Sequence, residues 1–298
     1  METRWRGCGT ALVTPFTKSG SIDEVALKRL TNWQIDRGIN FLVPCGTTGE
    51  SPTLSQTEKL RVIEIVITET NKRVPVLAGV GGADTQSVIQ LAKDVESLEP
   101  DGLLSVTPYY NKPSPAGIYQ HFRAIAENVK LPVIIYNVPN RTGCNINPET
   151  LFQLADIPNI IGVKEASGNL DQICTICRDS PDEFCVLSGD DAFTLALLAL
   201  GGSGVISVVS NEAPSEMTRL VSAALDSDFV TARNLHHRLL PLMQINFVES
   251  NPIPVKAALA EMGLIEECYR LPLVPPTQTS RKKIIKILND LGLSGKSL

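Results

Sequence analysis

The sequence predicts an α/β protein with a closed (β/α)8 TIM barrel, followed by an all-helical C-terminal appendage. Two observations carry this prediction: short apolar runs alternate eight times with amphipathic segments, and the apolar runs stop near residue 228. Apolar strands that alternate with helices form a parallel sheet covered on both faces. Eight such units within about 225 residues suit a closed barrel.

The predicted strands are short apolar runs bounded by turn residues. In chain order they cover residues 10–13, 41–44, 74–78, 102–106, 133–137, 160–164, 184–188 and 204–208. An open, doubly wound sheet is the alternative arrangement. No Gly-x-Gly-x-x-Gly motif follows the first run, which favours the barrel.

An amphipathic segment follows each predicted strand. Six of these helices are expected at residues 23–37, 85–97, 116–128, 170–178, 192–200 and 213–224. The second helix starts near Ser55, where Ser55-Gln56-Thr57-Glu58 has the form of a capping box. The fifth starts at Asn147, an N-cap residue followed by proline at the first helical position.

After residue 228 only helical patterns remain, at 230–247, 254–262 and 279–291. We therefore predict two domains. Residues 1–227 form the catalytic barrel and residues 228–298 form a helical domain.

Composition excludes several classes of function. The chain has 298 residues and a net charge of -5, so it offers no basic surface for nucleic acid or for an anionic membrane. Its longest apolar run, residues 195–200, is too short to span a bilayer. The first ten residues carry Glu2, Arg4 and Arg6 and no apolar core, so no secretory signal is expected.

The cysteines and histidines do not indicate a metal or redox centre. Seven scattered cysteines are typical of reduced thiols in a cytoplasmic protein. Cys174 and Cys177 have C-x-x-C spacing, but they lie within a predicted helix and lack a second pair. With only three histidines, two of them sequence neighbours, we expect no histidine metal site and no cofactor.

The sixth predicted strand, Ile160-Ile161-Gly162-Val163, ends in Lys164. An ammonium beside an apolar strand needs a partner or a task unless it is simply a solvated lysine past the strand end. Desolvation lowers the pKa of a lysine, and the neutral amine attacks ketones to form a Schiff base.

Other polar side chains follow neighbouring strands, at the end of the barrel where active sites lie. The turn Gly46-Thr47-Thr48-Gly49-Glu50 suits a carboxylate, although it also fits an ordinary glycine-rich turn. Tyr136 could relay protons or be a core tyrosine, and Arg141 could clamp a carboxylate or be a solvated loop cation. A lysine, an anion-binding turn, tyrosines and an arginine are what a ketoacid Schiff-base aldol reaction requires.

The chain resembles the dihydrodipicolinate synthase family of pyruvate-dependent aldolases over nearly its whole length. The resemblance rests on stretches 46–51, 107–111, 136–143, 162–166, 187–191 and 251–256 in this order and spacing. It implies condensation of pyruvate with L-aspartate 4-semialdehyde, in the diaminopimelate route to lysine. It also implies a homotetramer built from two tight dimers.

The resemblance further implies roles for individual residues. Lys164 would form the imine, and Tyr136 would be the central proton shuttle. Thr47 and Tyr110 would complete the relay, with Tyr110 entering the active site of the neighbouring subunit. For the substrates, the corresponding positions are Thr48 for the pyruvate carboxylate, Arg141 for the carboxylate of the aldehyde, and the backbones of Gly189 and Ile206 near the lysine.

Two other functions are compatible with part of this pattern. Sister aldolases that act on sialic or other sugar acids share the lysine and the tyrosine, but they generally lack the Arg141-Thr142-Gly143 turn. A catalytically silent barrel that serves as a scaffold or a regulatory binding module would be expected to lose part of the constellation, yet every position is filled.

The resemblance also bears on feedback inhibition by L-lysine. In regulated relatives a glutamate on the third helix holds the ammonium of the ligand, and histidines on the second helix line the pocket. The matching positions here are Ser87, Gln56 and Lys59, with Ala83 where an asparagine side chain would contact the ligand. Only Tyr109 and the region of Ser51 keep the pattern. Since no carboxylate would pair with the ligand, we expect weak or absent inhibition.

Overall fold

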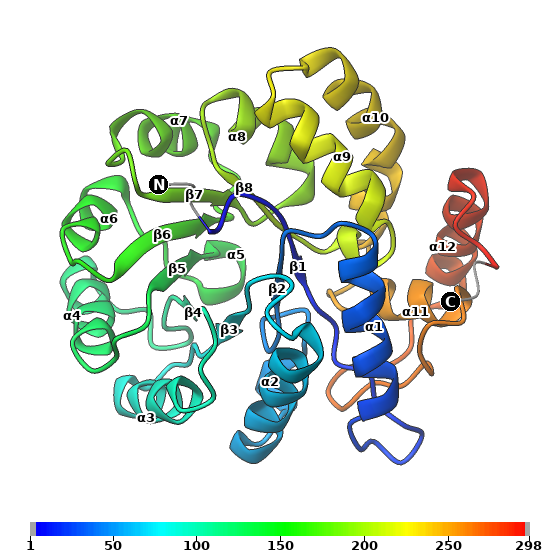
Figure 1. The fold of residues 1–298 in the computed structure, drawn as a ribbon, viewed down its shortest axis with the longest axis horizontal. Coiled ribbons are helices and arrows are strands. Elements are labelled where there is room, and N and C mark those ends of the chain that lie inside the picture. The colour runs from blue at the N-terminus through cyan, green and yellow to red at the C-terminus, as the bar shows by residue number, and fades with distance from the viewer. Residues whose placement is uncertain (1–3, 296–298) are drawn as a thin grey trace.

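Eight parallel strands surround one axis, and helices cover the outside of the ring (Figure 1). The structure is a computed structural model, and it describes residues 4–295. The strands are β1 (Gly7–Ala11), β2 (Phe41–Val43), β3 (Leu77–Gly79), β4 (Gly102–Val106), β5 (Val133–Asn137), β6 (Ile160–Glu165), β7 (Cys185–Ser188) and β8 (Gly204–Ser207). The predicted (β/α)8 barrel is confirmed.

The ring closes between β2 and β3, which is its weakest seam. All other neighbouring strands are paired in the order β2-β1-β8-β7-β6-β5-β4-β3. At the seam Leu42 and Val76 form an isolated parallel bridge, and the N–H of Gly79 donates to the carbonyl of Pro44 at 3.0 Å. Residues 74–76, predicted as part of the third strand, therefore lie outside β3, which begins at Leu77.

The helices of the barrel follow the strands as predicted, with bounds that differ by a few residues. They are α1 (Glu24–Asp36), α2 (Gln56–Thr70), α3 (Thr85–Glu96), α4 (Pro115–Ala126), α6 (Pro148–Ala155), α7 (Leu170–Asp179), α8 (Thr194–Ala199) and α9 (Pro214–Leu225). The capping box at Ser55 and Glu58 is present, and Asn147 caps α6. Short turns were not predicted, namely η1 (Ser51–Thr53), α5 (Pro139–Thr142), η2 (Asp191–Phe193) and η3 (Val209–Asn211).

Side chains fill the interior of the barrel from its amino-terminal end. Trp5 is 2% exposed and packs edge-on against Phe41, with ring centroids 5.5 Å apart. Leu77, Leu104, Ile134 and other apolar residues continue this cluster along the axis, and it reaches Tyr136. The interior is therefore a packed core, and space for a ligand is left at the carboxyl ends of the strands.

Three helices follow the barrel, namely α10 (Phe229–Ile245), α11 (Ile253–Glu261) and α12 (Gln278–Leu291). In Figure 1, α10 lies beside α9, and α11 and α12 lie outside α1. The domain boundary after residue 227 stays a prediction. The outermost residues of the two predicted domains, 1–3 and 296–298, lie outside the described residues.

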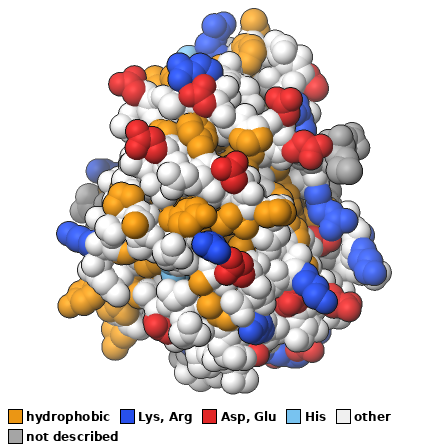
Figure 2. Space-filling view, turned by 90° about the vertical axis from the view of Figure 1, so that its left-hand side faces the viewer, with side chains coloured by type: hydrophobic (Ala, Val, Ile, Leu, Met, Phe, Trp, Pro, Cys, Tyr) orange, Lys and Arg blue, Asp and Glu red, His pale blue; other side chains and the backbone are white. Residues whose placement is uncertain are grey.

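Two features of the structure concern the membrane and the nucleic acid, the partners that the composition argues against. Among the described residues, no helix is both long and apolar enough to cross a membrane. On the face shown in Figure 2, acidic and basic side chains alternate around hydrophobic ones, so the basic residues of that face form no continuous region.

Candidate active site

Lys164 lies at the end of β6 and is paired in register with Tyr136 on β5. Its Nζ lies 4.2 Å from the centroid of the Tyr136 ring. The lysine is only 5% exposed, and it lines a cavity of about 530 Å³ at the carboxyl ends of the strands. The strand positions bring an amine and a phenol together inside the barrel mouth.

The surroundings of Lys164 favour its neutral form. Burial lowers the pKa of Lys164 from its ordinary value to about 7, and the nearby Arg141 guanidinium adds to this lowering. The Asp191 carboxylate opposes the lowering. Asp191 is itself buried and accepts hydrogen bonds from the N–H groups of Val208 and Val209. A substantial fraction of the lysine is therefore a free amine near neutral pH.

Tyr136 forms hydrogen bonds through both its main-chain carbonyl and its phenol hydroxyl. Its carbonyl accepts hydrogen bonds from the N–H and the hydroxyl of Thr107, at 2.9 and 3.0 Å. Burial raises the pKa of the Tyr136 phenol, while Arg141 and a hydrogen bond with the Thr47 hydroxyl act in the opposite direction. The phenol is therefore protonated near neutral pH and has a hydroxyl partner for proton exchange.

The turn after β2 presents two threonines to the cavity. The N–H groups of Gly49 and Glu50 donate to the carbonyls of Gly46 and Thr47, so they are used within the turn. The prediction that this turn suits a carboxylate therefore rests on Thr47 and Thr48, because these two N–H groups are already paired. Thr48 is 2% exposed, and its Oγ1 accepts a hydrogen bond from Asn251 Nδ2 at 3.0 Å.

Arg141 reaches the same cavity from α5, the short helix that follows β5. The helix ends at Thr142 and is capped by Gly143, whose φ of 71° is one that glycine adopts without strain. Arg141 is exposed, and its Nη2 donates to the carbonyl of Asn251 at 3.3 Å. The guanidinium is thus fixed at one nitrogen, and its other donors remain available to a ligand.

Gly189 and Ile206 occupy different environments. A Cβ at position 189 would lie 2.7 Å from the Ala166 Cβ and 3.1 Å from the Lys164 Cε, so the lysine passes directly over the glycine. Gly189 lines the cavity. The side chain of Ile206 is 1% exposed and packs in the barrel core, so any role of this residue in the site must come from its backbone.

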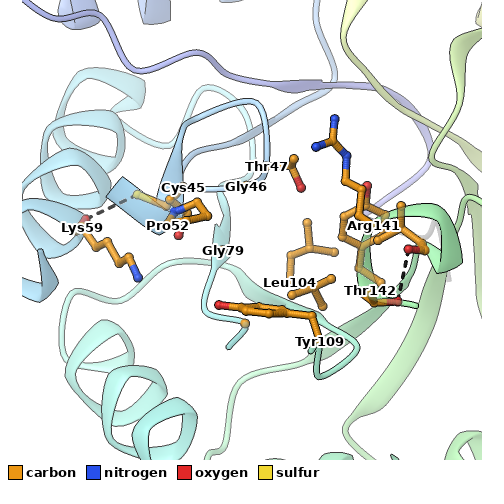
Figure 3. A pocket seen from close by; sticks show the side chains of 15 residues that line it. Cys45, Gly46, Thr47, Pro52, Lys59, Gly79, Leu104, Tyr109, Arg141 and Thr142 are labelled. Atoms are coloured by element: carbon orange, nitrogen blue, oxygen red, sulfur yellow. Dashed lines mark hydrogen bonds between the residues drawn. The ribbon is translucent and has the colours of Figure 1, made fainter. Parts of the chain in front are cut away.

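The structure does not bring Tyr110 into the cavity of its own chain. Tyr110 is 91% exposed and has a φ of 72°, which is uncommon for a residue other than glycine. Its neighbour Tyr109 lines a second cavity of about 250 Å³, next to the first. Figure 3 shows the Tyr109 hydroxyl pointing toward the side of this cavity where Lys59 lies. The two cavities share Thr47, Tyr136, Val138 and Arg141.

Asn251 is a site residue whose role the sequence did not predict. It is 5% exposed, lines the larger cavity and contacts both Thr48 and Arg141. It lies in the segment between α10 and α11, which also supplies Phe247, Val248, Glu249 and Ser250 to the cavity wall. Only one feature of the sequence pointed to Asn251, namely its position in the proline-containing stretch 251–256 that resembles the family.

The remaining candidate groups form no second centre. Cys174 and Cys177 lie on α7, as predicted, and neither forms a disulfide. Within residues 4–295, no group of three or more histidine, cysteine, aspartate or glutamate side chains is placed to hold a metal ion.

A buried lysine with a lowered pKa beside a tyrosine, at the mouth of a (β/α)8 barrel, defines an enzyme that works through lysine chemistry. The family model for "Dihydrodipicolinate synthetase family" matches residues 4–291. The chain belongs to this family.

Individual relatives agree with the family match. The chain is 54% identical over 289 residues to 4-hydroxy-tetrahydrodipicolinate synthase of Koribacter versatilis (strain Ellin345), an alignment that covers 97% of this chain and 96% of the relative. The corresponding protein of Syntrophus aciditrophicus (strain SB) is 52% identical, over 98% of this chain and 100% of its own. The crystal structure of dihydrodipicolinate synthase from Aquifex aeolicus superposes with a TM-score of 0.96 at 41% identity, covering 98% of this chain and all of that one.

Proposed function

We propose that this enzyme is a lyase that joins pyruvate to L-aspartate 4-semialdehyde through an imine on Lys164. The product is 4-hydroxy-tetrahydrodipicolinate, in the diaminopimelate route to lysine. The observation that carries the proposal is the buried Lys164 amine, 4.2 Å from the Tyr136 ring and with a pKa lowered to about 7. The relatives from Koribacter versatilis and Syntrophus aciditrophicus, which are 54% and 52% identical in sequence to this chain, bear the name of this synthase.

The reaction begins when the neutral Lys164 amine attacks the ketone carbon of pyruvate. A C–N bond forms, the ketone oxygen leaves as water, and the product is an iminium ion. Loss of a proton from the pyruvate methyl group then gives an enamine, because the iminium nitrogen accepts the electron pair. The Tyr136 hydroxyl, hydrogen-bonded to Thr47, supplies and removes protons in these steps.

Carbon–carbon bond formation follows at the same place. The enamine carbon attacks the aldehyde carbon of the second substrate, and the aldehyde oxygen takes up a proton. The amino group of the second substrate then attacks the imine carbon, which releases Lys164 and closes the ring. No oxidant or cofactor enters this balance.

The substrate carboxylates take two separate positions in this proposal. Thr48 binds the carboxylate of pyruvate, and Arg141 binds the carboxylate of the aldehyde with the donors that Asn251 leaves available. Gly189 permits the close approach to Lys164, where a Cβ would come within 3.1 Å of the lysine Cε. Ile206 contributes only its backbone.

We also propose a homotetramer of two tight dimers, working in the cytoplasm. The exposed Tyr110 would insert into the neighbouring subunit and reach its Thr47, completing the proton relay. A Tyr110→Phe variant is expected to keep its assembly in analytical ultracentrifugation and to lose turnover. A monomer in that measurement, with full turnover, would contradict the exchange of tyrosines.

The test of the function traps the imine. The enzyme is incubated with pyruvate and borohydride, and the peptide that contains Lys164 is analysed by mass spectrometry. We expect a reduced pyruvate adduct on Lys164 in the unaltered chain and none in Lys164→Ala, which should also lose several orders of magnitude in turnover. A chain that forms the adduct but does not consume aspartate semialdehyde would instead be a sister aldolase, and a chain without an adduct would not be an aldolase of this kind.

A further inference from the structure

Asn251 lies where the appended helices meet the barrel mouth. Its Nδ2 donates to the Thr48 hydroxyl oxygen at 3.0 Å, across 203 positions in the sequence. Its main-chain carbonyl accepts from Arg141 Nη2 at 3.3 Å, across 110 positions. One residue thus contacts both side chains that are proposed to bind substrate carboxylates.

We infer that Asn251 is a positioning residue that directs the hydroxyl proton of Thr48 toward the pyruvate carboxylate. This inference rests on the proposed function, because it takes pyruvate as the ligand of Thr48.

The direction of the hydrogen bond carries the inference. A threonine hydroxyl has one proton to donate and two lone pairs that accept. The Asn251 amide occupies a lone pair, so the Thr48 proton is left for another acceptor, and a carboxylate oxygen is the strongest acceptor available. If an acceptor stood at position 251, the proton would turn away from the substrate.

The burial of the pair strengthens this effect. Thr48 is 2% and Asn251 5% exposed, so little water competes for the hydroxyl. Asn251 Oδ1 has no hydrogen-bond partner in the part of the chain that the structure describes. A buried polar atom without a partner destabilises a fold, so the needs of folding alone do not explain an asparagine here.

A second contact holds the same turn without entering the cavity. Glu50, two residues after Thr48, forms an ion pair with Lys256 on α11 at 2.5 Å, and both side chains are fully buried. This pair anchors the turn on the appended helices. Asn251 is therefore free to act on the hydroxyl of Thr48 without being the main anchor of the loop.

The experiment compares three variants of the full chain. Asn251→Ala removes the donor, and Asn251→Asp keeps the shape but replaces the donor with an acceptor and adds a negative charge. Tyr269→Phe is the matched control. It removes a hydroxyl that donates to the carbonyl of Ile253 at 3.1 Å, at the start of α11, and Tyr269 lies outside the catalytic machinery. The readout is the pyruvate concentration that half-saturates borohydride trapping at Lys164, with KM for each substrate measured alongside.

We expect this half-saturating concentration to rise about tenfold in Asn251→Ala, the effect of one lost hydrogen bond. In Asn251→Asp it should rise about a hundredfold, because the bond reverses and like charges meet. The KM for the aldehyde should change less than about threefold in Asn251→Ala, since the carbonyl that holds Arg141 remains. The Tyr269→Phe control should trap pyruvate as the unaltered chain does.

A double variant tests whether Asn251 acts through Thr48. Thr48→Val removes the hydroxyl, so adding Asn251→Ala to it should weaken pyruvate trapping no further. Additive losses, or an aspartate variant no weaker than the alanine one, would overturn the inference. Failure of the unaltered chain to trap pyruvate would instead overturn the proposed function, and the inference with it.

Discussion

Lys256 and Glu50 form an ion pair in which neither side chain has any exposed surface. Lys256 Nζ also lies 4.3 Å from the centroid of the Phe16 ring and 5.4 Å from that of Tyr269. Burial lowers the pKa of Lys256, and the Glu50 carboxylate opposes that lowering. The pair joins α11 to the turn that carries Thr48.

Removal of one partner from this pair should destabilise the fold strongly. Lys256→Met leaves Glu50 buried without its partner, which costs about 3–5 kcal/mol of unfolding free energy. The matched control is Lys286→Met, because Lys286 pairs with Asp290 on the exposed face of α12 and such pairs contribute about 0–1 kcal/mol. Urea unfolding measures both variants, and equal losses would show that the buried pair is not an anchor.

The lowered pKa of Lys164 predicts the pH dependence of imine formation. Only the neutral amine attacks pyruvate, so the trapping rate should rise with pH and level off above about 7, the pKa of this lysine. The measurement is the initial rate of borohydride trapping at fixed pyruvate across the pH range. An increase that continues to the ordinary pKa of lysine, near 10.4, would mean that burial does not tune this amine.

Arg141 should affect the two substrates unequally. Arg141→Ala is expected to raise KM for the aldehyde by an amount equivalent to about 2–5 kcal/mol, the loss of a charged carboxylate contact. Pyruvate trapping should remain, because Thr48 holds that carboxylate. Arg141→Lys keeps the charge but not the planar guanidinium. In steady-state assays its KM for the aldehyde should lie between those of the unaltered chain and Arg141→Ala. Equal damage to both substrates would indicate a structural role.

Glu212 is a buried acid that should make stability depend on pH. Its Oε2 accepts from Asn246 Nδ2 at 2.7 Å, while Glu212 Oε1 and Asn246 Oδ1 have no partner among the described residues. Burial raises the pKa of Glu212 well above its ordinary value; the Asn246 hydrogen bond opposes this, and the nearby Asp191 charge adds to the rise.

The sign of this dependence follows from the raised pKa. The folded chain binds the Glu212 proton more tightly than the unfolded chain does. The stabilisation is therefore complete below the unfolded pKa, about 4.3, and is lost as pH rises from there toward the folded pKa. Glu212→Gln should unfold at higher temperature than the unaltered chain at pH 8, and the gain should shrink toward pH 5. A destabilised glutamine variant at pH 8 would contradict the prediction.

Inhibition by L-lysine should be weak or absent. Lys59 and Tyr109 face the smaller cavity (Figure 3), and no aspartate or glutamate is among the residues that line it. An ammonium ligand would meet a like charge there without an anionic partner, which costs at least about 2 kcal/mol and weakens binding some thirtyfold. Steady-state assays with added L-lysine check this expectation, and inhibition at submillimolar concentration would refute it.

Local patterns in the sequence were enough to predict the barrel, because alternation of apolar runs with amphipathic helices is a short-range property. They placed β4 and β5 at the residues the structure shows, and they placed Lys164 at the end of a strand. The strand ends of a barrel all face one rim, so residues that follow strands could be grouped into one candidate site before any contact was known. The resemblance to a family then indicated which reaction this group of residues would catalyse.

Contacts between distant segments were decided only by the tertiary structure. The sequence named Tyr136 and Lys164 separately, but their pairing across β5 and β6 depends on the register of the sheet. The lowered pKa of Lys164 depends on burial by many segments at once. The contact of Asn251 with Thr48 spans 203 positions and exists because the appended helices pack against the barrel mouth, which periodicity along the chain does not encode.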